Sequence, residues 1–186
     1  MRQRGVTDPD TKEMLGNIES RVNRAVYTVR QLLVLARLES HDVSLAMKTL
    51  NLHEVAEKAL ADHAHLAMER SLELSFPEEG QWMVRGESEI LATLVGNLLA
   101  NAFRYTPTGG RVVIDALQAD GAVRFTVAND CEPMTAAERE SLADRFYRRP
   151  GTESAGAGLG LSIVERIVEV HNASLALSAW EGDSGL

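Results

Sequence analysis

The sequence has little or nothing of several features that would assign a function class at once. Its 186 residues include a single cysteine, Cys131, so an internal disulfide is excluded and the thiol is interpreted as a small apolar core residue. No apolar run is long enough to span a bilayer and the N-terminus has no apolar signal core, so we expect a soluble, cytoplasmic chain. Positive charge is scarce as well. The 19 Lys and Arg against 27 Asp and Glu give a formal net charge of −8, which argues against a nucleic-acid partner.

Two common binding signatures are also missing. There is no Gly-Lys-Ser or Gly-Lys-Thr sequence of the kind that ends a phosphate-binding P-loop. His53, His63 and His65 lie within a short stretch, but no cysteine or further clustered histidine completes a set of metal ligands. We therefore expect these histidines on a solvated helix surface and predict no metal site made of them.

The N-terminal part of the chain has the periodicity of a long helix. Residues 1–12 are polar and contain a glycine and a proline, so we expect them to be flexible. One helix cannot bury a long apolar stripe alone, so residues 13–48 are predicted to be a bundle-forming helix and a connector, paired with a second helix or a second copy of the chain. The alternative is a helix packed on its own globular domain. The apolar residues of the stripe recur at spacings of three and four: Leu15, Ile18, Val22, Ala25, Val29, Leu32 and Ala36.

The remaining residues, 49–186, alternate between strand-like and helix-like patterns. This order predicts an α/β domain built as a two-layer sandwich, in which helices cover one face of a sheet. Strands are predicted at residues 72–76, 81–84, 111–117, 123–128 and 174–180, and helices near residues 52–70, 89–105 and 159–170.

The most informative stretch is residues 97–107, which read NLLANAFRYTP. At about 100° per residue, Asn97, Asn101 and Arg104 share one side of a helix, beside an apolar stripe that faces the core. Two amide oxygens one turn apart can ligate a hard cation, and a guanidinium one turn further can meet an anion, so Mg²⁺ with a phosphate is the natural ligand. A solvated polar edge is the alternative.

A glycine-rich loop leads into the last predicted helix, over residues 154–164, which read SAGAGLGLSIV. Gly156, Gly158 and Gly160 allow the backbone to approach a ligand closely. The N–H groups at the start of the helix form an anion site that suits a polyphosphate. A flexible loop before a glycine-rich helix start is the alternative.

Together with residues 144–150, which lie between them, these two segments resemble the N, F and G2 boxes of sensor histidine kinases of two-component systems. Residues 31–39 are similar to the end of the second helix of that family's dimerisation hairpin. The resemblance implies the Bergerat ATP-binding fold of the GHKL type, preceded by this bundle-forming helix, with a long lid between the regions of Asn129 and Gly158.

The resemblance also implies a role for each matching residue. Asn101 would hold Mg²⁺ with support from Asn97, Arg104 and Arg148 would meet the phosphates, and Asn129 would accept a hydrogen bond from adenine. The other expected nucleotide-binding residues are Tyr105, Cys131, Phe146, Tyr147, Gly156, Gly158, Leu159 and Gly160.

The sequence departs from the family's motifs at two places. Asn129, Cys131 and Pro133 stand where the family has an aspartate and two glycines, so we expect a modest affinity for adenine. None of the five histidines, at positions 41, 53, 63, 65 and 171, has the neighbouring acidic residue and following proline of a phosphoacceptor on a first hairpin helix. We expect that helix and a last strand to lie outside this chain.

The resulting hypothesis is an ATP-binding catalytic domain that transfers the γ-phosphoryl group of ATP to a histidine on a missing helix and then to a response regulator. The resemblance implies a homodimer through the helical bundle, and attachment to a bacterial inner membrane only through N-terminal segments absent here. Two alternatives stay open, a catalytically weak or degenerate nucleotide-sensing module and an ATP hydrolase of the same fold.

Overall fold

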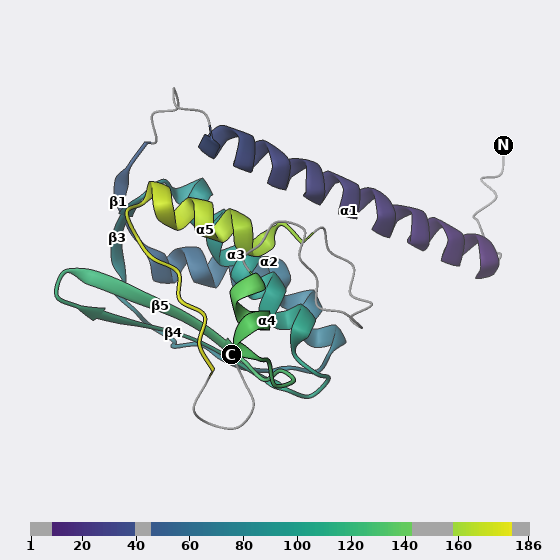
Figure 1. Ribbon diagram of the computed structural model, residues 1–186. Helices are drawn as coiled ribbons and strands as arrows, with labels where there is room; N and C mark the ends of the chain where they lie inside the picture. The colour runs from purple at the N-terminus through teal and green to yellow at the C-terminus, as the bar shows by residue number, and fades with distance from the viewer. Residues whose placement is uncertain (1–8, 40–45, 143–157, 180–186) are drawn as a thin grey trace.

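The computed structural model describes residues 9–39, 46–142 and 158–179, and Figure 1 shows their arrangement. The elements follow in the order α1 (Pro9–Glu39), β1 (Lys48–Asn51), α2 (Leu52–Glu69), β2 (Glu73–Ser75), β3 (Met83–Gly86), α3 (Ser88–Tyr105), β4 (Arg111–Ala119), β5 (Ala122–Asn129), α4 (Ala136–Ser141) and α5 (Gly160–Val170). No helix in these described ranges is both long and apolar enough to cross a membrane.

The strands form two small sheets. In the larger one, the order is β2-β4-β5, with β2 parallel to β4 and β4 antiparallel to β5. The β4–β5 connection is a two-residue turn at Asp120 and Gly121, which have φ values of 53° and 75°. Asp-Gly pairs adopt such positive φ angles readily, and the turn fixes the register that places Val112 opposite Asn129. In the smaller sheet, β1 and β3 are antiparallel.

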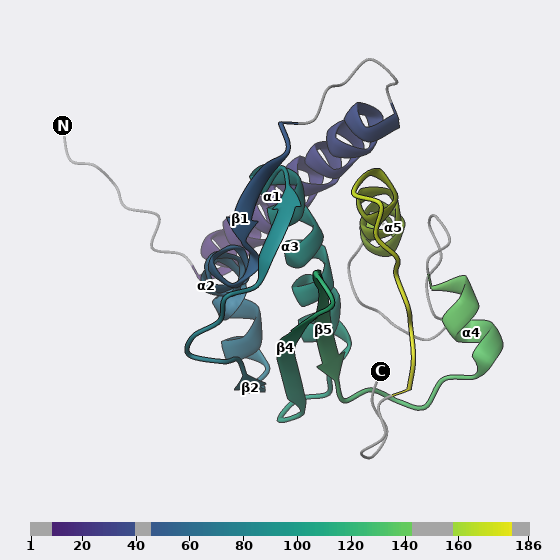
Figure 2. The same cartoon turned by 90° about the vertical axis from the view of Figure 1, so that its left-hand side faces the viewer.

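Helices α2, α3 and α5 lie together on one side of the larger sheet (Figures 1 and 2). This arrangement is the predicted two-layer α/β sandwich. Burial of each large side chain between the layers stabilises the fold by about 1.5–3 kcal/mol. The largest fully buried apolar side chains come from α3, α5 and β4: Val95, Leu99, Phe103, Ile163, Val164, Ile167, Val112 and Ile114.

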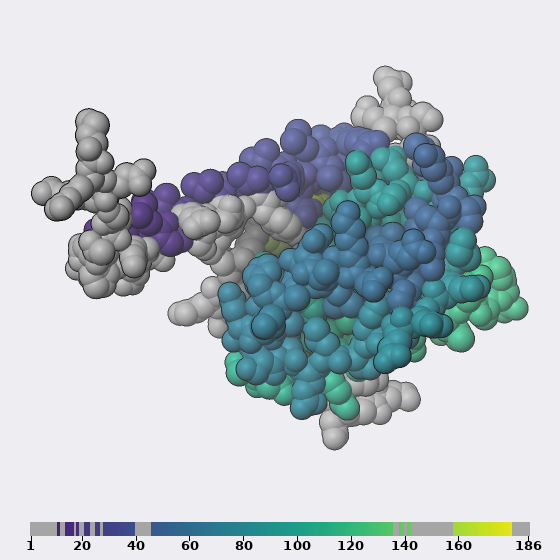
Figure 3. Space-filling view, turned by 180° about the vertical axis from the view of Figure 1, so that it is seen from behind, coloured from purple at the N-terminus to yellow at the C-terminus, as the bar shows by residue number. Residues whose placement is uncertain are grey.

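The helix α1 has two apolar faces, only one of which is covered in the single chain. Leu35 and Leu38, near its C-terminal end, are buried at 6% and 5% exposure. The stripe of heptad-spaced residues, which includes Val22 and Val29, is about half exposed, at 54% and 55%. The N-terminal half of α1 projects beyond the rest of the molecule (Figures 1 and 3). Part of α1 therefore packs on its own domain, and its bundle-forming role stays a prediction.

Several details differ from the expectation. Residues 174–179 pair with none of the described strands, so the strand predicted at 174–180 is wrong over this range, and Trp180 lies outside the described residues. Conversely, β1 lies where we expected the end of the connector and the start of the domain, without a strand. The short sequence KTLN does not predict a strand, and β1 forms because pairing with β3 supplies its hydrogen bonds. The helix α1 begins at Pro9, inside the segment expected to be flexible, and α4 occupies part of the expected lid.

The expected solvent exposure of the histidines is wrong for His53. It is buried at 6% exposure, its ring stacks on Phe76 with centroids 4.6 Å apart, and its Nε2–H donates to the carbonyl of Pro77 at 2.9 Å. The cause is its place on the first turn of α2, capped by Asn51, where its ring packs against Phe76 and Trp82. His65 is exposed and His63 is intermediate.

Candidate functional site

The first part of the candidate site is the polar side of α3. This helix forms because its leucines and small residues bury a wide face, and Asn97 lies so close to that face that only 2% of it is exposed. A buried amide must be hydrogen-bonded, and Asn97 Nδ2 donates to the carbonyl of Thr93 at 2.8 Å and to Gln31 Oε1 at 3.3 Å. One turn further along the helix, Asn101 is half-buried.

The second part is the start of α5, which lies directly against these two amides. A methyl group placed on Gly160 would lie 3.2 Å from Asn97 Oδ1 and 3.3 Å from both Asn101 Oδ1 and Asn101 Nδ2. Such contacts are tight, so the absence of a side chain at Gly160 lets the two helices approach at this point. The preceding Gly158 has a φ of 67°, a conformation that favours glycine. Two elements more than fifty residues apart therefore meet at the predicted amide and glycine residues.

The N-cap residue of α5 is Leu159, whose side chain makes no capping hydrogen bond to the start of the helix. The first N–H groups of an α-helix have no partner within the helix, and the helix dipole adds positive potential there. An uncapped helix start beside two amides is therefore suited to an anion such as a phosphate group.

Arg104 and Tyr105 complete the predicted residues of α3, in its last turn. Arg104 is half-buried and makes no ion pair with any residue in the described part of the chain, so its charge is available to an anion. Tyr105 is 39% exposed, which leaves an aromatic face accessible to a ligand.

The predicted adenine contact, Asn129, ends strand β5 and is 9% exposed. Its Nδ2 donates to the carbonyl of Asp130 at 3.0 Å, so the other end of the amide, Oδ1, is the end turned toward a potential donor. The neighbouring carboxylate of Asp130 accepts from the backbone N–H of Arg111 at 2.9 Å and is therefore committed to the sheet. Cys131 is buried and takes part in no disulfide, as expected for a small core residue.

Four predicted residues lie outside the described residues: Phe146, Tyr147, Arg148 and Gly156. Sequence analysis missed one residue next to the site, Gln31 of α1. Gln31, Leu35 and Leu38 are spaced as residues on one face of a helix are, and all three are buried. This second face is easily overlooked in the sequence because the heptad stripe is the stronger pattern.

The residues at this site fit a magnesium ion that would be coordinated partly by the protein and partly by a bound ligand. The described ranges hold no group of three or more His, Cys, Asp or Glu residues that could bind a metal ion by themselves. Mg²⁺ in nucleotide sites keeps several waters and uses few protein oxygens together with phosphates, so the amide oxygens of Asn97 and Asn101 supply a suitable donor set.

Comparison with known proteins agrees with this site. Residues 86–184 match the family described as "Histidine kinase-, DNA gyrase B-, and HSP90-like ATPase". The sensor protein kinase PmrB of Pseudomonas aeruginosa is 37% identical over 166 residues, which cover 89% of this chain and 35% of PmrB. The solved cytoplasmic segment of histidine kinase QseC is 25% identical, with a TM-score of 0.56 over 88% of this chain and 89% of that one.

A structure of histidine kinase ThkA in complex with response regulator protein TrrA has the same fold, with a TM-score of 0.68, 21% identity, and coverage of 92% of this chain and 48% of that one. The fold and the amide-lined site thus define an ATP-binding α/β domain. The chain belongs to the histidine kinase-, DNA gyrase B- and HSP90-like ATPase family and is an ATP-binding catalytic domain of the sensor histidine kinase type. It spans little more than a third of the length of the curated relatives that it matches.

Proposed function

We propose that this domain binds Mg²⁺-ATP and donates the γ-phosphoryl group to a histidine on a helix outside this chain, from which a response regulator receives it. The observation that carries the proposal is the convergence of Asn97 and Asn101 on Gly160 at the uncapped start of α5. This convergence combines oxygen ligands for a cation with backbone donors for phosphates.

In this proposal, different parts of the domain bind the ion, the phosphates and the base of the nucleotide. Asn101 holds Mg²⁺ with support from Asn97, and Arg104 with the N–H groups at Gly158 and Gly160 faces the phosphates. Arg148 and Gly156, outside the described residues, are proposed to add further phosphate contacts. Asn129 accepts a hydrogen bond from adenine, and the remaining base and lid contacts are Tyr105, Cys131, Phe146, Tyr147 and Leu159.

Phosphoryl transfer needs positioning and charge neutralisation more than a nucleophile from the domain itself. When bound, Mg²⁺ supplies part of the neutralisation of the phosphate charge. The chain's own contribution is fixed polar groups: the amide of Asn97, held by hydrogen bonds, the helix N–H groups, which need no reorganisation, and the guanidinium of Arg104, which makes no ion pair within the described residues. A carboxylate that could activate water is replaced by the neutral amide of Asn97, which favours transfer over hydrolysis.

The organisation proposed for the longer protein follows the same resemblance. Residues 13–48 act as a dimerisation helix and connector, and residues 49–186 as the catalytic domain. The partners are a second copy of the chain through the exposed stripe of α1 and a response regulator. The likeness to the cytoplasmic segment of QseC supports a place in the bacterial cytoplasm.

The test is the affinity for ATP, measured by calorimetry with and without Mg²⁺. We expect wild-type protein to bind ATP more tightly with Mg²⁺, and Asn101→Ala to lose about tenfold of the Mg²⁺-dependent affinity, because one ligand oxygen is removed. Affinity without Mg²⁺ should change little. Gln81→Ala, which removes an exposed amide before β3, is the matched control and should behave as wild type. No heat from ATP with wild-type protein, or an unchanged effect of Mg²⁺ in Asn101→Ala, contradicts the proposal.

A further inference from the structure

A buried amide of α1 contacts the candidate nucleotide site from outside the catalytic domain. Gln31 is 7% exposed and lies on the same side of α1 as the buried Leu35 and Leu38. A polar side chain with that degree of burial requires a specific partner. Its partner is Asn97, sixty-six residues away in sequence, whose Nδ2 lies 3.3 Å from Gln31 Oε1.

Two hydrogen bonds donated by the Asn97 NH₂ group show which way the amide points. The carbonyl of Thr93 can only accept a hydrogen bond, so the atom 2.8 Å from it is the NH₂ group of Asn97. The atom of Gln31 that faces the same NH₂ group is then its oxygen. With Nδ2 held on two acceptors, Oδ1 is directed to the other side, where it lies against Gly160 and Asn101.

We propose that Gln31 is a positioning residue of the nucleotide site: its side-chain oxygen holds the Asn97 amide in the orientation that presents Oδ1 to the start of α5. Without this acceptor, the NH₂ group loses one of the hydrogen bonds that hold it, and the amide is less firmly fixed about its last side-chain bond. This inference rests on the proposed function, because the oxygen of Asn97 supports the ion that Asn101 binds. Gln31 itself does not touch the nucleotide.

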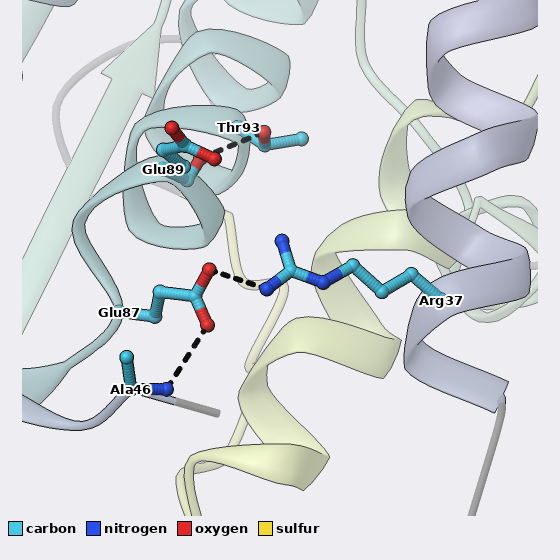
Figure 4. A network of polar contacts seen from close by, with 5 residues as sticks. All are labelled: Arg37, Ala46, Glu87, Glu89 and Thr93. Atoms are coloured by element: carbon cyan, nitrogen blue, oxygen red, sulfur yellow. Dashed lines mark hydrogen bonds and ion pairs between the residues drawn. The ribbon is translucent and has the colours of Figure 1, made fainter. Parts of the chain in front are cut away.

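Two contacts keep α1 where Gln31 reaches Asn97. Arg37 Nη2 lies 2.8 Å from Glu87 Oε1, and the other oxygen of Glu87 accepts from the backbone N–H of Ala46 at 3.3 Å, as Figure 4 shows. Glu87 is the N-cap residue of α3, so this ion pair ties α1 to the helix that carries Asn97. Arg166 of α5 donates to the carbonyl of Leu38 at 2.9 Å. The oxygen of Gln31 is therefore in place only while α1 is docked, which links the helix position to the site.

The experiment compares three variants with wild type. Gln31→Met keeps the length and volume of the side chain and removes the acceptor, whereas Gln31→Glu keeps an acceptor oxygen. Leu35→Met is the matched control, a change to the same residue at a neighbouring buried position of α1. The first measurement is the side-chain NH₂ signal of Asn97 in isotope-labelled, nucleotide-free protein, followed by NMR hydrogen exchange. The second is the gain in ATP affinity on adding Mg²⁺.

We expect Gln31→Met to shift the Asn97 NH₂ signal, speed its exchange and reduce the Mg²⁺-dependent gain about fivefold, the value of one hydrogen bond. Leu35→Met should stay within twofold of wild type in both measurements, and Gln31→Glu should keep the Asn97 NH₂ group hydrogen-bonded, with slower exchange than in Gln31→Met. An unchanged NH₂ signal and an unchanged Mg²⁺-dependent gain in Gln31→Met overturn the inference, as does an equal loss in Leu35→Met. Failure of wild type to bind ATP would instead overturn the proposed function, and the NH₂ signal would then still decide whether Gln31 holds Asn97.

Discussion

At the scale of single residues, the candidate site depends on which end of each amide points inward. The sequence identifies Asn97, Asn101 and Asn129 from their spacing and resemblance, but an amide has a donor and an acceptor end, and composition cannot say which one faces a ligand. The hydrogen bonds show which end faces a ligand, because the NH₂ groups of Asn97 and Asn129 both donate to backbone carbonyls. The oxygens are therefore directed to the places where a cation and an adenine amino group are expected.

Replacement of Asn129 by Asp should change affinity and stability in opposite directions. A carboxylate accepts a hydrogen bond from the adenine amino group about 1 kcal/mol more strongly than an amide does, so ATP affinity should rise about fivefold. The NH₂ group that donates to the carbonyl of Asp130 at 3.0 Å is lost, and two oxygens then face each other. The free energy of unfolding should fall by about 1 kcal/mol. Calorimetry with ATP and denaturant unfolding measure the two effects.

Two controls separate base recognition from general effects of charge. GTP has a carbonyl where adenine has its amino group, so its affinity should not rise in Asn129→Asp. Glu132→Gln changes an exposed charge three residues away and should alter neither measurement by more than a small factor. Equal gains for ATP and GTP would mean that residue 129 does not contact the base.

At the scale of helices and strands, the elements that sequence analysis predicted best are those with a strong pattern of their own. The helices α2, α3 and α5 have long apolar faces, and β4 and β5 are bounded by turn residues, so each is recognisable locally. The strand β1 owes its conformation to pairing with β3, and residues 174–179 have a strand-like sequence without a described partner. Pairing is a property of two segments, and one sequence window cannot supply it.

The helix α1 shows the same limit in another form. The heptad stripe dominated the sequence pattern, and it concealed a second face, of Gln31, Leu35 and Leu38, that docks on the domain. These two faces lie on opposite sides of the helix at about 100° per residue. When α1 packs on its own domain, the heptad stripe stays accessible to another helix. Packing of α1 on the domain and packing of α1 in a helical bundle can therefore occur together.

Replacement of Val22 and Val29 by Glu should abolish self-association of the chain. Both side chains are about half exposed in the single chain, so the change should cost the monomer little. In a helical bundle they would be buried, and an unpaired buried charge costs several kcal/mol. Light scattering at high protein concentration should show assemblies for wild type and monomers for the double variant. Arg30→Glu places a charge at an exposed position beside the stripe and should keep the wild-type mass. Equal masses for wild type and the double variant would show that the stripe does not mediate association.

At the scale of the whole molecule, the site is a meeting point of segments that are distant in sequence. Asn97 and Asn101 come from α3, Gly160 from α5 and Gln31 from α1, so the side-chain amides and the glycine come from three separate helices. The motif residues were predictable because their types are specific to a nucleotide site. The contribution of α1 was not, because a single glutamine in a long helix has no recognisable pattern until the helix is docked.

The histidines provide the last prediction, which concerns the activity of the chain by itself. His53 is 6% exposed and its Nε2 is hydrogen-bonded to the carbonyl of Pro77 at 2.9 Å, Nε2 of His171 is buried, and Nδ1 of His63 is hydrogen-bonded to the carbonyl of Ala59 at 2.8 Å. A histidine that receives a phosphoryl group must present a free, accessible nitrogen to the γ-phosphate in line with the leaving oxygen. His65 is exposed on α2 but is followed by Leu66 and not by an acidic residue, and His41 lies outside the described residues.

We therefore expect the 186-residue chain to bind Mg²⁺-ATP and yet to acquire no phosphohistidine. Incubation with γ-labelled ATP, followed by measurement of acid-labile phosphate, should give no label above that of the Asn101→Ala variant, which lacks the proposed Mg²⁺ ligand. Calorimetry on the same sample confirms that nucleotide is bound, so a blank result cannot come from an empty site. Stoichiometric acid-labile phosphate that Asn101→Ala abolishes would show that a histidine within the chain reaches the γ-phosphate, and a His41→Gln variant would then identify whether that histidine is the one in the connector.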